Sequence, residues 1–178
     1  ALLMDQFRNE NSTVRKKAAK MLTEIGRDNE NVVSAMSLAL SDTESLTRIN
    51  AALVLANIGK IDSAVSAELL SAFKNSIQVD EVSPALERLA KKNKTLKQAL
   101  LVALSEDDNS IRQRAASLLV SLGKTDSSIA LALLSILNHK NDHVRLRVIK
   151  MLGDIGDTDE AVIIALKSVL KDEDTDIR

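Results

Sequence analysis

Residues 11–26 read NSTVRKKAAKMLTEIG, and residues 108–123 read DNSIRQRAASLLVSLG. The two stretches carry apolar residues at matching positions, three and four residues apart, which places those residues on one face of a helix. Both stretches begin with Asn or Asp and end with glycine. A helical pattern that recurs with its flanking residues indicates an internal repeat, and a repeat determines the fold class.

The repeat has two halves, each with helical spacing. In the first half, Val14, Ala18, Leu22 and Ile25 recur as Thr47, Ala51, Leu55 and Ile58, as Ile111, Ala115, Leu119 and Leu122, and as Val144, Val148, Leu152 and Ile155. In the second half, a set of three apolar residues recurs at steps of 33, 31, 33 and 33 residues. The sets are Val32, Met36 and Leu40; Val65, Leu69 and Phe73; Leu96, Leu100 and Leu104; Ile129, Leu133 and Leu137; and Val162, Leu166 and Leu170. We therefore predict helix-pair repeats over 9–41, 42–74, 75–105, 106–138 and 139–171.

The two ends of the chain fit partial repeats. Residues 1–8 match the end of a second helix, with Leu3 and Phe7 in its apolar columns, and residues 172–178 lead into a first helix. Each repeat of such an array needs neighbours to cover its apolar faces. We expect the chain to be part of a longer array.

The junction inside each repeat has its own residue types. Directly after the first helix, where the left-handed conformation of a C-cap favours glycine, stand Gly26, Gly59, Gly123 and Gly156, with Ala90 in the third repeat. Three residues later comes a column whose side chains accept hydrogen bonds from the opening amides of a helix, namely Asn29, Asp62, Asn93, Asp126 and Asp159. These columns predict where each first helix ends and each second helix begins.

Composition supports a globular all-α chain. It has 178 residues, 45% of them hydrophobic, with one proline and two aromatic residues, whereas sheets draw on aromatic and β-branched residues. Lys and Arg number 24 against 25 Asp and Glu, so no overall field attracts nucleic acid or an anionic membrane. The chain has no cysteine for disulfides or thiolate chemistry and no apolar run long enough to span a bilayer. We expect a cytoplasmic protein.

The first-helix pattern D-x-x-V-R-x-x-A-A-x-x-L-x-x-I-G resembles the HEAT repeat, in particular the short units of the phycobilisome-lyase type. The resemblance covers essentially the whole chain and implies a right-handed α-solenoid. Its second helices lack the glycine, proline and alanine lead-in usual in lyase-type units, which argues against a bilin-lyase role. No His-Glu pair is present, so the metal site of the HEAT-like hydroxylase that acts on deoxyhypusine does not map here.

A column of arginines follows the first apolar residue of the first helices: Arg15, Arg48, Arg112, Arg145 and Arg178. The third repeat interrupts it with Val79, or with Glu81 in the other register. The resemblance implies a structural ladder in which these arginines pair with acidic or amide groups of adjacent repeats. Phosphate binding is the alternative interpretation.

The third repeat is irregular, because it lacks two residues and contains the only proline, Pro84. We predict a shortened or kinked first helix there, with Ser83 as its N-cap, Pro84 at the first helical position and residues 75–82 as a loop. The loop could bend the array or contact a partner, or it could be drift in a tolerant repeat.

Residues for catalysis or metal binding are few. His139 and His143 are four residues apart and could bind a metal, but no third ligand is near in the register, so exposed histidines are the simpler interpretation. Asp172, Asp174 and Asp176 alternate as in a calcium loop, yet Ile177 stands where that loop requires glycine. We predict no enzyme activity, no catalytic residue, no metal site and no cofactor.

The outward face of the second helices is nearly uncharged. Of its twenty positions only Lys74 and Lys171 carry charge, whereas about a quarter to a third of a free surface is charged. Charge depletion is typical of a protein-binding patch, and the resemblance places this face on the concave side of the solenoid. The predicted partner-binding residues are Ser34, Leu38, Ala67, Ser71, Gln98, Val102, Leu131, Ser135, Ile164 and Ser168.

Three other interpretations of this surface remain. Small residues could simply let the array curve tightly. Basic residues of the first helices could bind nucleic acid, although they lie on the wrong helix for the groove and stacking aromatics are scarce. These basic residues are Arg15, Lys16, Lys17, Lys20, Arg112, Arg114, Arg145, Arg147 and Lys150. The chain could also be the regulatory or sensor arm of a larger enzyme. The interpretation that we favour is a scaffold or adaptor that binds a protein or peptide, with no membrane contact.

Overall fold

The computed structural model describes the chain except residues 1, 125, 138, 140, 157–159 and 171–178, and except the side chains at 127, 161, 165, 168 and 169. The described residues form eleven helices and no strand. They divide into two compact units, residues 1–89 and 90–178. The all-α prediction is confirmed, and within the described part no helix combines the length and apolarity that crossing a membrane requires.

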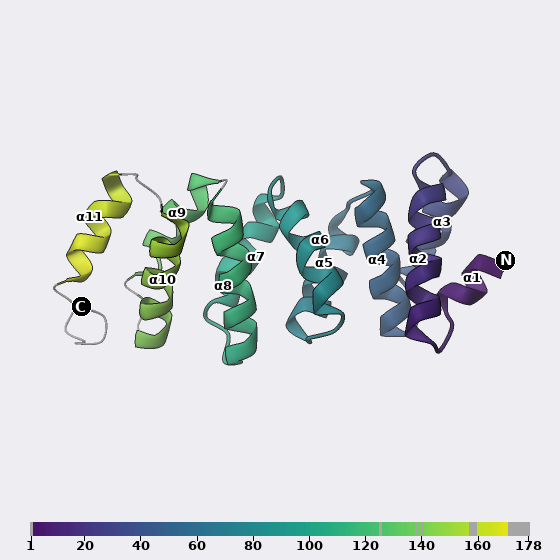
Figure 1. The fold of residues 1–178 in the computed structure, drawn as a ribbon, viewed down its shortest axis with the longest axis horizontal. Coiled ribbons are helices and arrows are strands. Elements are labelled where there is room, and N and C mark those ends of the chain that lie inside the picture. Colours follow the sequence, from purple (N-terminus) through teal and green to yellow (C-terminus); the bar gives the residue numbers. More distant parts are fainter. Residues whose placement is uncertain (1, 125, 138, 140, 157–159, 171–178) are drawn as a thin grey trace. The chain divides into compact units, whose positions relative to one another are not determined.

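The first unit contains α1 (Leu2–Phe7), α2 (Ser12–Gly26), α3 (Glu30–Ala39), α4 (Ser45–Ile58), α5 (Ser63–Lys74) and α6 (Val79–Ala90), whose last residue belongs to the second unit. First helices of the repeats (α2, α4, α6) alternate with second helices (α3, α5), as Figure 1 shows. Helix α2 packs against α1, α3 and α4, and α4 packs against α3 and α5. Each helix therefore covers the apolar face of its neighbours in sequence.

The second unit contains α7 (Lys94–Ala103), α8 (Asn109–Gly123), α9 (Ser127–Leu134), α10 (Asp142–Ile155) and α11 (Glu160–Val169). The first helices α8 and α10 pack against each other, and α8 also contacts α7 and α9. The second helix α9 contacts both α7 and α11. This arrangement creates two surfaces in the unit, one formed by first helices and one by second helices.

The core follows the predicted apolar columns. Met36, Leu69, Leu100 and Leu119 are fully buried, and Phe7, in the last turn of α1, is buried with them. Ile25 and Leu170 are exceptions, at 50% and 63% exposed, and Gly26 beside Ile25 is buried. The helical spacing therefore identifies most of the buried face, and the error at Ile25 arises in the last turn of α2, where the glycine takes the inward position.

The Asn and Asp column forms the predicted N-caps. The side chains of Asn29 and Asp126 accept hydrogen bonds from the amides two residues later, at 3.1 Å each. Those of Asp62 and Asn93 accept from the amides three residues later, at 2.9 and 3.0 Å. Asp159 lies outside the described residues. One polar side chain thus starts each described second helix by satisfying an amide that the helix leaves unpaired.

The glycine column serves two purposes, of which the sequence predicted one. Gly59 and Gly156 are left-handed C-caps, with φ of 84° and 67°. Gly26 and Gly123 instead lie in the last turn of α2 and α8, followed by caps of right-handed conformation. A Cβ at Gly123 would clash with Ile155 in α10. The prediction of a left-handed cap is therefore wrong for these two glycines, and at Gly123 the close packing against Ile155 requires the absence of a side chain.

The third repeat differs from its prediction. Helix α6 is short, as expected, but it begins at Val79 and contains Pro84 in its interior, so Ser83 is not its N-cap. The amide of Val82 donates to the carbonyl of Gln78 at 2.9 Å, which forms the first turn before the proline. Val82 is fully buried. Burial of this residue draws residues 79–83 into the helix, although Pro84 cannot donate to the carbonyl four residues earlier.

Residues 75–78 replace most of the predicted loop with a tight turn. Ser76 adopts a left-handed conformation with φ of 59°, and the amide of Ile77 donates to the carbonyl of Ala72 at 2.9 Å. This pattern of bonds is a Schellman turn, which ends α5 in very few residues. The compact turn explains how the third repeat accommodates its two missing residues.

Candidate interaction surfaces

In the second unit, the second helices expose an apolar row on a face whose described positions carry no charge. Val102 of α7 is 56% exposed, Leu131 of α9 is 46% exposed and Ile164 of α11 is 59% exposed. Gln98 and Ser135, predicted for the same face, are exposed as well. Ser168 lies outside the described side chains. Because α9 contacts both α7 and α11, the row belongs to three neighbouring helices.

The equivalent face of the first unit is formed by α3 and α5. Leu38 is 78% exposed, and Ser34, Ala67 and Ser71 are also exposed. Among the described positions of this face, in either unit, Lys74 alone is charged, and it is half-buried. Burying such a surface against a partner would require little desolvation of charge, which is the main cost of closing a polar interface.

The arginine column contacts main-chain oxygens of the loop before its own helix. Nη1 of Arg15 donates to the carbonyls of Asn9 and Glu10, at 2.7 and 2.6 Å. Nη1 of Arg48 and Nη1 of Arg112 each donate to two carbonyls, which lie six and five residues earlier. Nη1 of Arg145 donates to the carbonyl six residues earlier. These distances are 2.7–3.1 Å. Each loop joins the second helix of one repeat to the first helix of the next. Each arginine therefore holds the loop that leads into its own first helix.

This geometry corrects the expected ladder of side-chain pairs between adjacent repeats. The carboxylate that pairs with Arg48, Glu68, belongs to the same repeat, and the one that pairs with Arg145, Asp142, belongs to the same helix. Arg178 lies outside the described residues. Because Nη1 of each described arginine is engaged by carbonyls, phosphate binding through Nη1 of this column gains no support.

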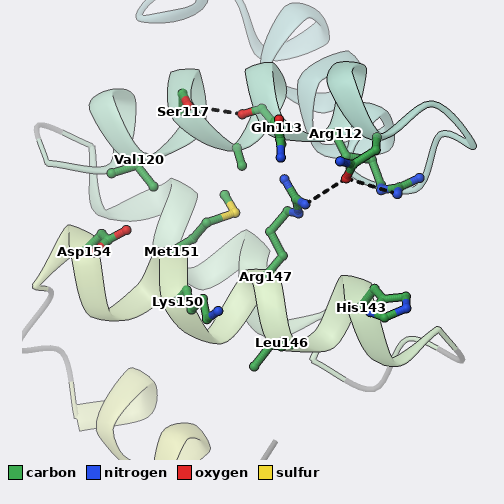
Figure 2. Close-up of a pocket in the computed structure, with 12 residues that line it drawn as sticks. Arg112, Gln113, Ser117, Val120, His143, Leu146, Arg147, Lys150, Met151 and Asp154 are labelled. Atoms are coloured by element: carbon green, nitrogen blue, oxygen red, sulfur yellow. Dashed lines mark hydrogen bonds between the residues drawn. The ribbon is translucent and has the colours of Figure 1, made fainter. Parts of the chain in front are cut away.

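A groove with a basic end lies between α8 and α10 and has a volume of about 870 Å³. Figure 2 shows the two helices facing each other across it, with side chains of both directed into the space. Its basic and polar end is formed by Asn109, Arg112, Gln113, His143 and Arg147. Its remaining wall carries Ala116, Ser117, Val120, Leu146, Lys150, Met151 and Asp154.

Two guanidinium groups share one neutral acceptor in this groove. Oδ1 of Asn109 accepts from Nη2 of Arg112 and from Nη2 of Arg147, each at 3.2 Å (Figure 2). Burial of Arg147, together with the positive charge of Arg112, lowers the pKa of the Arg147 guanidinium from its ordinary value. Like charges are thus held close together without a carboxylate between them.

The first unit has a smaller hollow of about 490 Å³ among α2, α4 and α6. Lys16 of α2 forms an ion pair with Glu81 of α6 across this hollow, and Nη2 of Arg88 donates to Oδ1 of Asn57 at 2.5 Å. Asn50, which is 3% exposed, leaves its side-chain NH₂ without a partner at the wall. Unlike the described residues that line the groove between α8 and α10, those of this hollow therefore include an ion pair between two helices.

The two histidines do not form a site together in the described structure. Nδ1 of His139 accepts from the amide of Asn141 at 3.1 Å, and Nε2 lies 3.4 Å from Oγ of Ser105. His143 is exposed and belongs to the α8–α10 groove. No cluster of three metal-ligating side chains occurs among the residues that the structure describes. Asp172, Asp174 and Asp176 lie outside that part of the chain.

The model of the HEAT repeats family matches residues 1–90 and 98–178. This chain is a member of the HEAT repeat family. The family resemblance inferred from the sequence is confirmed, and the helix pairs of both units are HEAT repeats. No curated protein sequence matches this HEAT repeat chain.

Solved structures similar to this HEAT repeat protein include engineered repeat proteins. A crystal structure of an engineered protein has 18% sequence identity and a TM-score of 0.44, over 98% of this chain and 90% of the other. A designed armadillo repeat protein has 12% identity and a TM-score of 0.45, over 99% and 94%. Another, in complex with the peptide (KR)4, has 11% identity and a TM-score of 0.40, over 99% and 93%.

Sequence reasoning identified the residues of the α8–α10 groove only as scattered basic positions. Arg147 occupies the column two residues after the loop-binding arginines, where the other repeats carry Lys17, Asn50 and Arg114. Recurrence of Arg at this column was the available signal. The sequence does not show that Arg147 and Arg112 meet at one asparagine, because this depends on how α8 and α10 pack.

Proposed function

We propose that this HEAT repeat chain is a non-catalytic protein-interaction module that holds a segment of a partner protein on its second-helix face. The observation that carries the proposal is the exposed row Val102, Leu131 and Ile164, on a face whose described positions in the second unit carry no charge. Burying apolar surface contributes roughly 25 cal/mol per Å², so three such side chains supply a useful share of a specific interface. The helix-pair fold, which commonly serves as a scaffold for protein interactions, supports the same assignment.

The test is capture of a partner with a double variant. Val102→Arg with Leu131→Arg places two charges in the centre of the row, where a partner would have to desolvate them. We expect this variant to fold normally and to lose the proteins that the unsubstituted chain retains from a lysate. The matched control, Met21→Arg with Ile61→Arg, also replaces two exposed apolar residues but outside the second-helix face. This control variant should retain the same proteins as the unsubstituted chain.

Nuclease treatment separates this proposal from nucleic-acid binding through the basic first helices. Retained proteins that survive nuclease, are lost in the Val102 and Leu131 variant and bind the purified chain directly would support the module. Equal capture by all variants would refute the second-helix assignment. Capture that disappears with nuclease would favour the nucleic-acid alternative. Whether the module serves as a scaffold or as the regulatory arm of an enzyme follows from the identity of the retained partner.

A further inference from the structure

The groove between α8 and α10 holds cations that have no anionic partner. Within the described residues, Arg147 and Lys150 form no ion pair, and Nε of Arg147 is buried without a hydrogen-bond acceptor. The nearest acidic caps are engaged elsewhere, since Asp108 accepts from the amide of Ser110 and Asp142 pairs with Arg145. Arg147 is half-buried, and a cation that has lost part of its hydration is ordinarily paired, so this end of the groove lacks an acceptor of negative charge.

We propose that this groove binds an acidic segment of another protein, with a carboxylate of that segment held by Arg147 and Arg112. A carboxylate would replace the neutral amide oxygen of Asn109 as the shared acceptor of two guanidinium groups. A carboxylate adds charge–charge attraction and a bidentate geometry to the hydrogen bonds that the neutral amide oxygen already accepts. The bound carboxylate would also offset the repulsion between the two arginines.

The shape of the groove favours a peptide over an isolated anion. Beyond the basic end, the wall offers Ala116, Val120, Leu146 and Met151, which are buried or half-buried apolar groups. Helix α10 has 14 residues, about 21 Å at 1.5 Å per residue, which matches roughly six residues of extended chain. A segment that alternates acidic and apolar side chains would use both parts of the groove, whereas a phosphate would use only the basic end.

The site is separate from the second-helix face. It is built from first helices, and none of its lining residues belongs to the row of Val102, Leu131 and Ile164. Binding of an acidic segment here therefore does not depend on the proposed function. The double variant of that row should bind an acidic peptide as the unsubstituted chain does, so the two proposals can fail independently.

The test uses a fluorescein-labelled hexapeptide that alternates Glu with Leu, titrated with the full chain and followed by anisotropy. We expect binding that weakens as salt is added and a roughly tenfold loss when Gln replaces Glu in the peptide. Arg147→Gln should weaken binding by a similar factor. Lys17→Gln is the matched control. Lys17 is exposed and occupies the same column of the repeat as Arg147, and its substitution by Gln removes one positive charge, as Arg147→Gln does. It should leave binding unchanged.

Several results would overturn the proposal. Equal affinity for the Glu and Gln peptides, or an equal loss in Arg147→Gln and Lys17→Gln, would show that the groove does not recognise a carboxylate. Tighter binding of a single-stranded oligonucleotide of equal charge, lost in Arg147→Gln, would assign the groove to nucleic acid. Circular dichroism checks each variant. If Arg147→Gln unfolds, Lys150→Gln at an exposed position provides the test, with an expected loss of roughly threefold.

Discussion

A Cβ atom at Gly123 would lie 2.5 Å from Cδ1 and 2.7 Å from Cγ1 of Ile155. Real Cβ atoms do not approach other carbons so closely, so the packing of α8 against α10 depends on the absence of a side chain at this position. Gly26 has the corresponding place against Ile58 in the first unit, but there a Cβ would lie 3.6 Å from both Cδ1 and Cγ2 of Ile58. The two glycines occupy one column of the repeat and tolerate substitution differently.

Gly123→Ala should therefore destabilise the chain by about 1–3 kcal/mol, because either α10 or the side chain of Ile155 must move. Chemical denaturation followed by circular dichroism measures this loss. Ile155→Val removes Cδ1, and the double variant should recover part of the loss. Gly26→Ala should cost less, since its closest neighbour is Cγ1 of Val32 at 3.0 Å. Equal costs at both glycines would contradict the packing explanation.

Leu119→Ala should reduce the free energy of unfolding by about 2–5 kcal/mol, because it leaves a cavity at a fully buried position of α8. Leu38→Ala makes the same chemical change at a side chain that is 78% exposed, and it should stay within about 0.5 kcal/mol of the unsubstituted chain. Both values come from denaturant titration. A loss below about 1 kcal/mol at Leu119 would mean that the helical register is misassigned.

Arg15→Met should destabilise the first unit by about 1.5–3 kcal/mol, since it removes a charged donor from the carbonyls of Asn9 and Glu10 while keeping much of the side chain's apolar volume. Arg15→Lys should recover only part of this stability, because an ammonium group lacks the planar fork of a guanidinium. Lys17→Met, at an exposed position of the same helix, is the control. A full recovery by lysine would indicate that charge alone matters at this column.

Acid should weaken the second unit partly through Asp126. Its hydrogen bonds with Lys97, then with the Ser128 hydroxyl and amide, lower the pKa of the Asp126 carboxyl below its usual value. A lowered pKa in the folded state stabilises the fold above the unfolded-state value of about 4, and this contribution is lost as pH falls through the folded-state pKa. Stability should therefore change little between pH 7 and about pH 5 and fall at lower pH, towards the folded-state pKa.

Asp126→Asn should reduce this fall without removing the cap. Asparagine caps the equivalent helices at Asn29 and Asn93, so the hydrogen bond to the helix amide can persist while the titrating charge is lost. Denaturation midpoints at several pH values provide the measurement. Part of the pH dependence of stability should remain in Asp126→Asn, because hydrogen bonds from backbone amides also lower the pKa values of Asp42 and Asp108. If stability changes with pH in the variant as steeply as in the unsubstituted chain, Asp126 makes no contribution to that change.

Local chemistry in the sequence was sufficient for most of the fold. Apolar residues at helical spacing identified core positions such as Met36 and Leu119, because an amphipathic helix can bury only one face. The Asn and Asp column identified the described N-caps, because the cap bond joins residues two or three apart. The prediction failed where distant residues decide the outcome, as at Ser83, where burial of Val82 extends the helix beyond the expected cap.

The sequence by itself determined that this chain is a series of helix pairs, which faces are apolar and which second-helix positions lack charge. These properties depend on residue type and spacing within one repeat. Only the tertiary structure decided that Gly59 caps a helix while Gly123 makes room for Ile155, that the arginine column binds loop carbonyls, and that Arg112 and Arg147 meet at Asn109. The contacts between α8 and α10 depend on how closely those two helices pack, whereas the glycine cap and the arginine contacts depend on the path of the backbone at the helix ends.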